Sequence, residues 1–388
     1  MKSFLPALSV ALALAAHSAL PAKAAEAGSP TAPETMRELT SMQFSSLMSP
    51  GWNLGNALEA IDSKHPYVWG STVFQETAWG NPPATRQLFD AVKLVGFRSV
   101  RIPVSWKVYA DAQDNISPQW MQRVAQVVDD ARAAGLIVMI NLHWDGGWMQ
   151  PTYAAQNMAQ ARMRKFWQQI ATRFRDYGDT LLFAGTNEVM VDGDYGAPTS
   201  EYCAVQNSYN QTFIDTVRAT GGNNTRRHLV VQGFNTNIDY TLKCNATLPH
   251  DSTAQRMMME VHDYDPFDFA QDEKSGVWRW GSAANPTGWA NEAYTDGQFE
   301  KLRKAFIARG IPVLLGEYSA IQRSEFDPSG SQRKYWDSYM TRAAHSRGIV
   351  PMYWDNGYTT NHQSGLFDRG RAVPVYRDII EALVKASQ

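Results

Sequence analysis

The most regular feature of this sequence is an alternation of short apolar runs with longer amphipathic segments. Eight runs rich in Val, Ile, Leu and Met predict strands that are buried on both faces. These strands cover residues 51–54, 98–104, 136–143, 181–187, 228–233, 257–262, 312–317 and 350–354. Seven segments with apolar positions at helical spacing predict helices. These helices cover residues 84–95, 119–134, 158–177, 204–219, 295–309, 332–347 and 375–385.

Nearly every predicted strand is followed by a predicted helix, which indicates βα units and a parallel sheet. Eight such strands predict an α/β protein with the (β/α)8 TIM-barrel fold. Gly follows five of the helices, where a left-handed backbone can end the helix, at Gly96, Gly135, Gly221, Gly310 and Gly348. The fifth unit is the least regular, because residues 235–254 show no clear helical pattern. An open doubly wound sheet is the alternative, but no Gly-rich phosphate loop follows an early strand.

The first 24 residues have the pattern of a signal peptide. Lys2 supplies a positive charge, residues 4–16 are apolar, and Ala22-Lys23-Ala24 is a small-x-small cleavage motif. A membrane anchor is the alternative, but the apolar run is short and no later stretch is long enough to span a bilayer. We therefore expect removal of residues 1–24 and a secreted product, extracellular or periplasmic. Residues 25–35 predict a disordered leader, and residues 36–388 a single catalytic barrel domain.

Composition narrows the possible partners. The 388 residues are 44% hydrophobic and 19% charged, so the chain can bury a large core. Its net charge of −2 gives no excess of positive charge that would attract nucleic acid or anionic membranes. The 13 Trp and 16 Tyr residues indicate either additional core packing or a groove with stacking platforms for sugars. Cys203 and Cys244 predict one disulfide between adjacent loops, with two free buried thiols as the alternative. We expect a monomer that needs no cofactor and no metal.

Two of the predicted strands end in a glutamate, Glu188 and Glu317. A carboxylate at the end of a buried strand must be hydrogen-bonded, paired or catalytic, because desolvating its charge is costly. In a TIM barrel the carboxyl ends of the strands converge on one mouth, where function is concentrated. Reading the other strand ends adds the polar and aromatic residues Asn53, Asn56, Arg101, His143, Trp144, Asn187, Gln232, His262, Tyr264, Trp354 and Asp355.

Two carboxyl groups at one mouth suit the cleavage of a glycosidic bond. That reaction needs a proton on the leaving oxygen and electron density at the anomeric carbon, so one carboxyl group must be protonated and the other ionised. Arg101 beside a carboxylate would hold it ionised.

The remaining strand-end side chains could bind and orient the sugar. His143 and His262 can orient neighbouring groups and donate hydrogen bonds. Tyr264 can donate to the nucleophile, and Asn187 can bind a sugar hydroxyl beside the reacting carbon. Trp354 offers a flat apolar face to the C–H surface of a sugar ring.

An ordered set of motifs, spanning nearly all of residues 36–385, resembles glycoside hydrolase family 5. The motifs are Gly51-Trp52-Asn53-Leu54-Gly55-Asn56, Thr77-Ala78-Trp79-Gly80-Asn81-Pro82, Val100-Arg101-Ile102-Pro103-Val104-Ser105-Trp106, Asn141-Leu142-His143, Asn187-Glu188, His262-Asp263-Tyr264-Asp265-Pro266-Phe267-Asp268-Phe269, Leu315-Gly316-Glu317-Tyr318, Tyr353-Trp354-Asp355-Asn356-Gly357 and Gly365-Leu366-Phe367-Asp368-Arg369. More closely, the chain is similar to the bacterial endoglucanase and xyloglucanase subfamily, subfamily 4.

This resemblance implies a role for each matching residue. Glu188 would be the acid/base and Glu317 the nucleophile of a retaining enzyme. The side chains around the cleaved linkage would be Arg101, His143, Asn187, His262, Tyr264 and Trp354. Three positions depart from the family pattern: Val189 stands where Pro usually follows the acid/base, Trp144 replaces a second His, and Asp263 varies the His-x-Tyr element.

The predicted function is a secreted retaining endo-β-1,4-glucanase whose partner is a β-glucan polysaccharide. Xyloglucan, mixed-linkage glucan and mannan are alternative substrates for the same chemistry. A metal-dependent barrel hydrolase using His143, His262 and Glu317 as ligands is a rival hypothesis, although the chain has no His-x-His pair at an early strand end. A non-catalytic sugar-binding barrel is the third, but it would be expected to lack one of the two glutamates.

Overall fold

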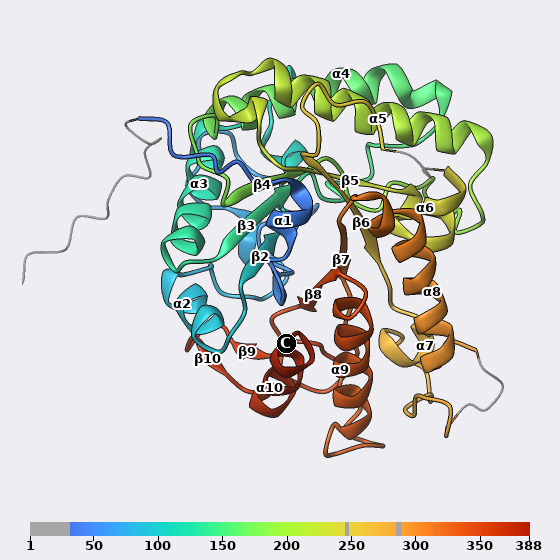
Figure 1. Cartoon of the computed structure of the whole chain (residues 1–388). Helices are drawn as coiled ribbons and strands as arrows, with labels where there is room; N and C mark the ends of the chain where they lie inside the picture. The colour runs from blue at the N-terminus through green and yellow to red at the C-terminus, as the bar shows by residue number, and fades with distance from the viewer. Residues whose placement is uncertain (1–31, 245–247, 285–288) are drawn as a thin grey trace, which may run out of the picture.

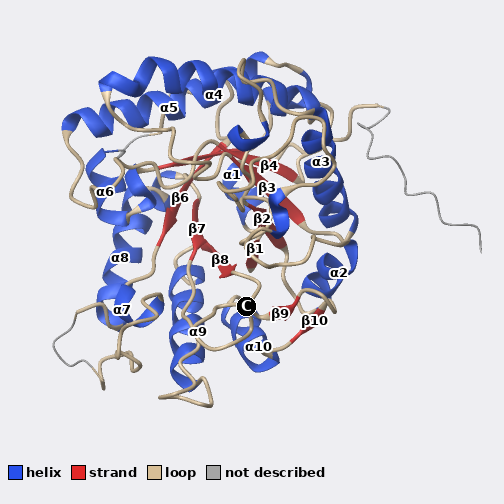
Figure 2. Cartoon of the chain, turned by 180° about the vertical axis from the view of Figure 1, so that it is seen from behind, coloured by secondary structure: helices blue, strands red, loops and turns tan. Residues whose placement is uncertain are grey.

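Eight parallel strands close into a barrel, and helices cover its outer surface (Figures 1 and 2). Each strand pairs with the next along the chain, and β8 pairs with β1 to close the ring. The strands are β1 Gly51–Leu54, β2 Ser99–Ile102, β3 Ile137–Asn141, β4 Leu181–Ala184, β5 Leu229–Gln232, β6 Met257–His262, β7 Val313–Glu317 and β8 Ile349–Asp355. This confirms the predicted (β/α)8 TIM barrel and excludes the open sheet.

The structure is a computed structural model that describes residues 32–244, 248–284 and 289–388. The predicted signal peptide and most of the predicted leader lie outside the described residues. Glu34, near the end of that leader, is hydrogen-bonded to the barrel through its backbone N–H, which donates to Asp176 O at 2.8 Å. Its carboxylate accepts from Gly178 N at 2.8 Å.

All seven predicted helices are present, each with bounds within a few residues of the prediction. The helices are α1 Ser41–Ser45, α2 Arg86–Leu94, α3 Pro118–Ala133, α4 Tyr153–Arg173, α5 Ser200–Ala219, α6 Ile238–Cys244, α7 Phe267–Ala270, α8 Glu292–Ala305, α9 Ser331–His345 and α10 Arg377–Ala386. Short 3-10 turns are η1 Gln75–Thr77, η2 Lys107–Tyr109, η3 Gly222–Thr225, η4 Phe234–Thr236 and η5 Ile307–Arg309, and a small antiparallel pair is formed by β9 Phe367–Asp368 and β10 Val373–Pro374.

Three short helices, α1, α6 and α7, were not predicted. α6 corrects the expectation that the fifth unit has no helix, since it occupies seven residues of that segment. A helix of two turns is too short to develop an amphipathic pattern. Helices α2, α4 and α8 begin at the side-chain caps Thr85, Thr152 and Asn291, each of which accepts a backbone N–H of the first turn. The five glycines predicted to follow helices all have positive φ.

The inside of the barrel changes from apolar to polar along its axis. At the amino ends of the strands the inward side chains form an apolar cluster of Met139, Leu182, Val230, Met258, Leu314, Val350 and Met352. Phe44 of α1 and the nearby Met48 pack against this cluster and close the floor of the barrel. Because strand side chains alternate, the next inward positions lie two residues further along, nearer the mouth. These positions hold Asn53, Arg101, Asn141, Gln232, Glu260, Gly316 and Trp354.

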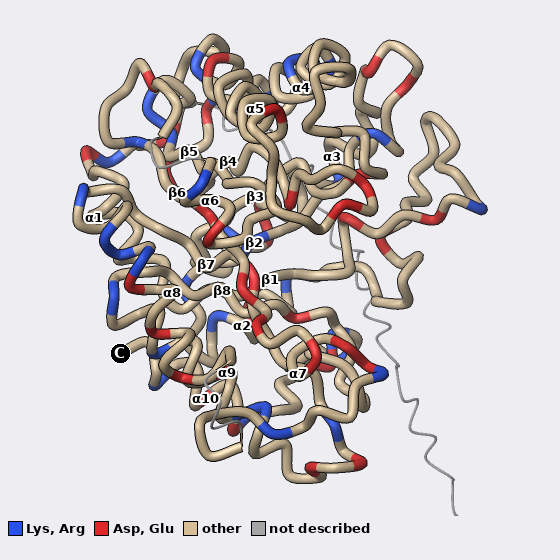
Figure 3. Tube along the Cα trace, turned by 90° about the vertical axis from the view of Figure 1, so that its right-hand side faces the viewer, with Lys and Arg blue, Asp and Glu red and all other residues tan. Residues whose placement is uncertain are grey.

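Cys203 of α5 and Cys244 of α6 form the predicted disulfide. The bond joins two helices rather than two loops, and so it ties the short α6 to the long α5. Within the described part of the chain, no helix combines the length and the apolar character needed to cross a bilayer. Along the Cα trace in Figure 3, Lys and Arg positions are interspersed with Asp and Glu positions, in keeping with the small net charge.

Candidate active site

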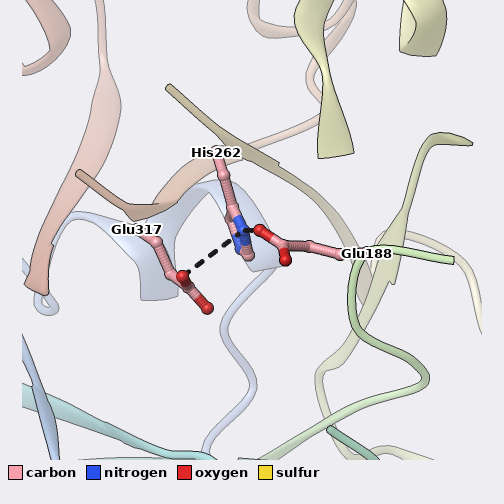
Figure 4. A group of neighbouring side chains, drawn as sticks. All are labelled: Glu188, His262 and Glu317. Carbon is pink, nitrogen blue, oxygen red and sulfur yellow. Dashed lines mark hydrogen bonds and ion pairs between the residues drawn. The ribbon is translucent and has the colours of Figure 1, made fainter. Parts of the chain in front are cut away.

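Glu188 and Glu317 extend from β4 and β7 to the same point at the mouth of the barrel. In Figure 4 both carboxylates point toward the imidazole ring of His262. The Nδ1 atom of His262 lies 2.7 Å from Glu188 Oε1 and 3.7 Å from Glu317 Oε2. One oxygen of each glutamate and one nitrogen of the histidine all lie within 4.8 Å of one another. The two glutamates therefore face each other across a single narrow gap.

Glu317 is held by hydrogen bonds on both carboxylate oxygens. Arg101 Nη1 donates to its Oε1 at 2.7 Å, and Tyr264 OH donates to its Oε2 at 3.0 Å. These are the two contacts that the sequence predicted for a nucleophile. Burial raises the pKa of Glu317, while the nearby charges of His262 and Arg101 oppose that increase.

Arg101 is fully buried and connects groups on several strands. Its Nη1 also donates to Asn53 Oδ1 at 3.0 Å, and its Nη2 donates to Asn187 Oδ1 at 2.5 Å. Its Nε lies 2.8 Å from Glu260 Oε1. Since β2 and β6 are four strands apart in an eight-stranded ring, this ion pair spans the barrel.

Glu260 is a third carboxylate of the site and was not identified from the sequence. Its side chain is completely buried, and its Oε1 also lies 3.1 Å from His262 Nε2. Burial alone would raise the pKa of Glu260, but Arg101 and His262 lower it to about 2. The three carboxylates outweigh the cost of burial for His262 and raise its pKa to about 9. A charged residue within the apolar run of residues 257–261 was the signal that could have revealed it.

The backbone at Glu188 leaves β4 in an unusual conformation. Glu188 has a φ of 47°, in the left-handed region that non-glycine residues rarely adopt. Its N–H donates to Gln232 Oε1 at 3.0 Å, and Asn235 N donates to Val189 O at 3.0 Å. These bonds from the end of β5 and the turn after it hold the backbone at Glu188 in this conformation. Burial opposes ionisation of Glu188, but the hydrogen bond from His262 holds its pKa below the usual value.

His143, after β3, and Trp354, at the end of β8, bring two aromatic rings together at the mouth. Their rings are stacked, with centroids 6.2 Å apart and an interplanar angle of 8°. His143 Nδ1 is 3.2 Å from Asn141 Nδ2, and burial together with Arg101 and His262 lowers the pKa of His143 well below its usual value. A neutral His143 beside the half-buried Trp354 provides a flat wall for a sugar ring.

A cavity of about 610 Å³ opens beside Glu188, bordered by the loops after β3, β4, β5 and β6. Three exposed aromatic side chains line it: Trp144, Tyr195 and Phe267 are 51%, 75% and 62% exposed. Polar side chains, including Gln150 and Asn237, complete the lining. Trp144, which replaces a second histidine, therefore faces this cavity beside Glu188.

Two of the predicted strand-end residues, Asp355 and Asn56, have supporting roles, as does Asp263 between His262 and Tyr264. Asp355 is buried and accepts from Trp52 Nε1 at 3.0 Å and from Leu366 N at 2.8 Å. Asn56 O accepts from Asn81 Nδ2 at 3.0 Å. Asp263 accepts from the backbone of the next turn, and burial raises its pKa to about 8. These residues shape the loops around the mouth.

The Trp-Gly-Asn-Pro motif after β1 is explained by its contacts with the loop after β8. Asn81 Nδ2 donates to Asn356 O at 2.9 Å as well as to Asn56 O. A Cβ at Gly80 would lie 1.8 Å from Tyr358 OH, and one at Gly357 would lie 1.9 Å from Asn81 Oδ1. The two glycines therefore allow these loops to close against each other beside Trp354.

The three Trp residues of the insertion after β6 differ in their burial and in their contacts. Trp280 is buried, and its Nε1 donates to Ala290 O at 2.5 Å, so it holds the loop. Trp278 stacks on Phe326 of the loop after β7, with ring centroids 6.3 Å apart. Trp289 is 56% exposed and packs against Tyr294.

Glu188, His262 and Glu317 are the group among the described residues whose atoms could hold a metal ion. His143, a ligand in the metal-dependent hypothesis, is not part of this group. Arg101 and Tyr264 already donate to both oxygens of Glu317, and a guanidinium at 2.7 Å disfavours a second cation there. The donor set fits a hydrogen-bonded carboxylate better than a metal ligand.

Comparison with known proteins gives consistent matches over most of the chain. The family described as "Cellulase (glycosyl hydrolase family 5)" matches residues 63–360. Endoglucanase A of Paenibacillus barcinonensis is 40% identical over 375 residues, covering 91% of this chain and 92% of that protein. The solved GH5 xyloglucanase of Bacteroides ovatus, in complex with a XXXG heptasaccharide, has a TM-score of 0.84 and 38% identity, covering 92% of this chain and 79% of that one. A GH5-4 broad specificity endoglucanase from Clostridium longisporum has a TM-score of 0.82 and 31% identity, covering 91% and 99% of the two chains.

Proposed function

Since the chain belongs to glycosyl hydrolase family 5 and is a glycoside hydrolase, we propose that it cleaves β-1,4-glucan chains internally, with retention of anomeric configuration. The observation that carries this proposal is the gap between Glu188 and Glu317, whose nearest oxygens lie within 4.8 Å. Retaining enzymes keep their two carboxyl groups about 5–5.5 Å apart, whereas inverting enzymes need about 6.5–9.5 Å to place a water between them.

In the first step, Glu317 attacks the anomeric carbon and forms a glycosyl ester while the bond to the leaving sugar breaks. Glu188 gives its proton to the leaving oxygen, which departs as a hydroxyl. In the second step, water attacks the same carbon, Glu188 takes a proton from that water, and the ester bond to Glu317 breaks. The second step returns both carboxyl groups to their starting states.

The acid and the nucleophile are assigned from their hydrogen-bond donors. Arg101 and Tyr264 stabilise charge on Glu317, whereas the side chain of Glu188 is 40% exposed toward the cavity. In the free protein, burial raises the pKa of Glu317 and His262 lowers that of Glu188. A bound glucan would remove water from Glu188 and raise its pKa, while both donors remain on Glu317.

Exposed aromatic side chains on both sides of the glutamates support internal cleavage. Trp69 and Trp79 lie in the loop after β1 and are 50% and 40% exposed, and Trp79 O accepts from the hydroxyl of Tyr358 in the loop that follows Trp354. Tyr195 and Phe267 line the cavity on the side of Glu188. A chain that passes across the mouth could stack on both sets, so it need not end at the site. Asn187, whose Oδ1 accepts from Arg101, can present its amide N–H to a sugar hydroxyl.

Xyloglucan is the second candidate substrate. The solved relative from Bacteroides ovatus is a xyloglucanase bound to a XXXG heptasaccharide, and its fold matches this chain at a TM-score of 0.84. The cavity of about 610 Å³ beside Glu188 has room for sugar side branches on the leaving-group side.

The deciding experiment follows the stereochemistry of hydrolysis by NMR. We expect cellopentaose to release the β-anomer first, and initial release of the α-anomer would overturn the proposal. Glu317→Gln should abolish turnover, whereas Glu273→Gln, an exposed glutamate outside the site, should not. Product sizes on carboxymethylcellulose, xyloglucan, lichenan and glucomannan then identify the preferred polymer. Activity should survive exhaustive chelation, and its loss would favour the metal-dependent hypothesis.

We also propose that the protein is exported. The support is the charged, apolar and small-x-small pattern of residues 1–24, together with a disulfide, which persists in oxidising compartments. N-terminal sequencing of the protein recovered outside the cytoplasm should begin at Ala25. Recovery of a chain that begins at Met1 in the cytoplasm would contradict the proposal.

A further inference from the structure

Glu260 is a buried carboxylate at the centre of the site that the proposed reaction does not use. It lies on β6, faces the barrel interior and is fully buried beneath the two catalytic glutamates. A buried charge is retained only when its partners offset the cost of desolvation. The identity of those partners indicates what Glu260 does.

A single oxygen of Glu260 contacts both cations of the site. Its Oε1 lies 2.8 Å from Arg101 Nε and 3.1 Å from His262 Nε2. The opposite side of each cation contacts a catalytic carboxylate. Arg101 Nη1 donates to Glu317 at 2.7 Å, and His262 Nδ1 lies 2.7 Å from Glu188. Glu260 is therefore connected to Glu317 through Arg101 and to Glu188 through His262.

The ring orientation of His262 follows from these contacts. With Glu260 on Nε2 and Glu188 on Nδ1, both nitrogens face carboxylate oxygens, and a ring that donates to both is an imidazolium, in keeping with the raised pKa of His262. The pairing of β6 with β7 shifts in register at Val261 and His262, which brings His262 opposite Glu317. A local irregularity of this kind re-aims a side chain at the edge of a site.

The charges of the whole cluster also require Glu260. The titratable or polar groups around it come from β2, the end of β4, β5, β6 and β7, and they are Arg101, Glu188, Gln232, His262 and Glu317. Three ionised carboxylates facing two cations leave one negative charge, which a single proton would neutralise. That proton is the one that a glycosidase must deliver to its leaving group. His143, which faces the same cations, is held neutral by burial.

We propose that Glu260 is a positioning residue that holds Arg101 against Glu317 and keeps His262 charged against Glu188. This inference rests on the catalytic roles proposed for those two glutamates. Glu260 does not itself reach the mouth, so it acts only through Arg101 and His262. Removing its charge should therefore alter the protonation of the site more than the binding of substrate.

The test is Glu260→Gln, which keeps the shape of the side chain and removes its charge. We expect kcat to fall by about 100-fold, because misplacing a catalytic group has an effect of that size. KM should stay within a factor of about three, and the alkaline limb of kcat/KM should move to lower pH, because the negative charge of Glu260 raises the pKa of both Glu188 and His262. An unchanged pH profile with a lower kcat would reduce Glu260 to a purely structural role and overturn the proposal.

A spectroscopic measurement separates this inference from the proposed function. The imidazole nitrogens of His262, followed by NMR in the full chain, should titrate near the pKa of about 9 in the native protein and at a clearly lower pH in Glu260→Gln. This result does not depend on hydrolysis, so it stands even if the chain acts on another glycoside. An unshifted His262 titration would overturn the inference alone.

Two further variants complete the design. Glu59→Gln removes another fully buried carboxylate, which accepts backbone N–H groups of Asn56 and Ala57 outside this cluster, and it should leave the His262 titration unchanged. If Glu260→Gln does not fold, Glu260→Asp keeps the charge but withdraws it by one methylene. That variant should lose less than tenfold in kcat and keep the native pH profile. A displaced alkaline limb in Glu260→Asp would contradict the proposal.

Discussion

The carboxylate of Glu260 occupies the space in which a side chain at Gly316 would begin. A Cβ at Gly316 would lie 2.1 Å from Glu260 Oε1, far inside van der Waals contact. Gly316 immediately precedes Glu317 on β7, and β6 and β7 are paired. The glycine of the Leu-Gly-Glu motif therefore makes room for a carboxylate on the neighbouring strand.

Gly316→Ala should nearly abolish activity. The new methyl group would displace Glu260 from Arg101 and His262, and overpacking of this kind destabilises a protein by about 1–3 kcal/mol. We expect a loss of kcat of about 100-fold or more with a modest fall in Tm. Gly276→Ala is the control, because nothing lies within 4 Å of a Cβ at that position. Equal activity of the two variants would contradict the steric argument.

Tyr264→Phe should weaken Glu317, the proposed nucleophile, without removing it. The variant loses the 3.0 Å hydrogen bond to Glu317 Oε2, and a bond to a charged group contributes about 1.5–3 kcal/mol. We expect kcat/KM to fall by about 10–100-fold and the acidic limb to move to higher pH, since the ionised form of Glu317 loses a donor. Tyr335→Phe removes a similar bond to Glu292 at the surface and serves as the control. A shift of the acidic limb to lower pH would exclude this role.

The alkaline limb of kcat should lie at higher pH than that of kcat/KM. The profile of kcat/KM reports the free enzyme, in which His262 holds the pKa of Glu188 down. The profile of kcat reports the complex, in which substrate covers the half-exposed carboxyl group and disfavours its ionisation. Both profiles can be measured on one soluble glucan across pH 4 to 10, a range of about six units. Coincident alkaline limbs would mean that substrate does not desolvate Glu188.

Tyr195→Ala and Phe267→Ala should weaken binding on the leaving-group side. Both side chains line the cavity beside Glu188, where stacking on sugar rings would contribute about 1–2 kcal/mol each. We expect KM for long cello-oligosaccharides to rise by about 5–30-fold, with little change for aryl glycosides that have a small leaving group. Met158→Ala, at an equally exposed apolar residue on α4, is the control. Equal effects on long and short substrates would place these rings outside the path of the chain.

Removing the disulfide should lower stability more than activity. Cys203 and Cys244 are 41 positions apart, and a cross-link over a loop of this length contributes about 2–4 kcal/mol, chiefly by constraining the unfolded chain. The double Ser variant should show a lower Tm by calorimetry. A reducing agent should lower the Tm of the native protein and leave that of the variant unchanged. Equal Tm values for the native, oxidised protein and the double Ser variant would indicate that α6 needs no covalent support.

Positions at the strand ends were predictable because the fold itself brings them together. Once the alternation of apolar runs and helices predicts a parallel barrel, every carboxyl end must open at one mouth. Glu188 and Glu317 could therefore be placed in one site although they come from β4 and β7. The direct contacts of Arg101 and Tyr264 with Glu317 followed the same reasoning and are confirmed.

Pairing across the inside of the barrel could not be predicted in the same way. Glu260 lies within a strand, and its partner Arg101 comes from the opposite side of the ring. Periodicity indicates which face a side chain occupies, but it does not indicate which side chain it meets. The same limit applies to Asp355, predicted at the mouth but buried among loop backbone groups. α6 escaped prediction because seven residues carry too little pattern.

The positions of the two described ends of the chain have a practical consequence for mounting the enzyme on a solid support. Glu34 binds the backbone at the amino end of β4, and Val384, in the last turn of α10, lies against Gly96 just before β2. Both described ends of the chain therefore emerge at the base, opposite the catalytic opening. A tether attached through either end would hold the enzyme upright, with its opening directed toward the dissolved polymer.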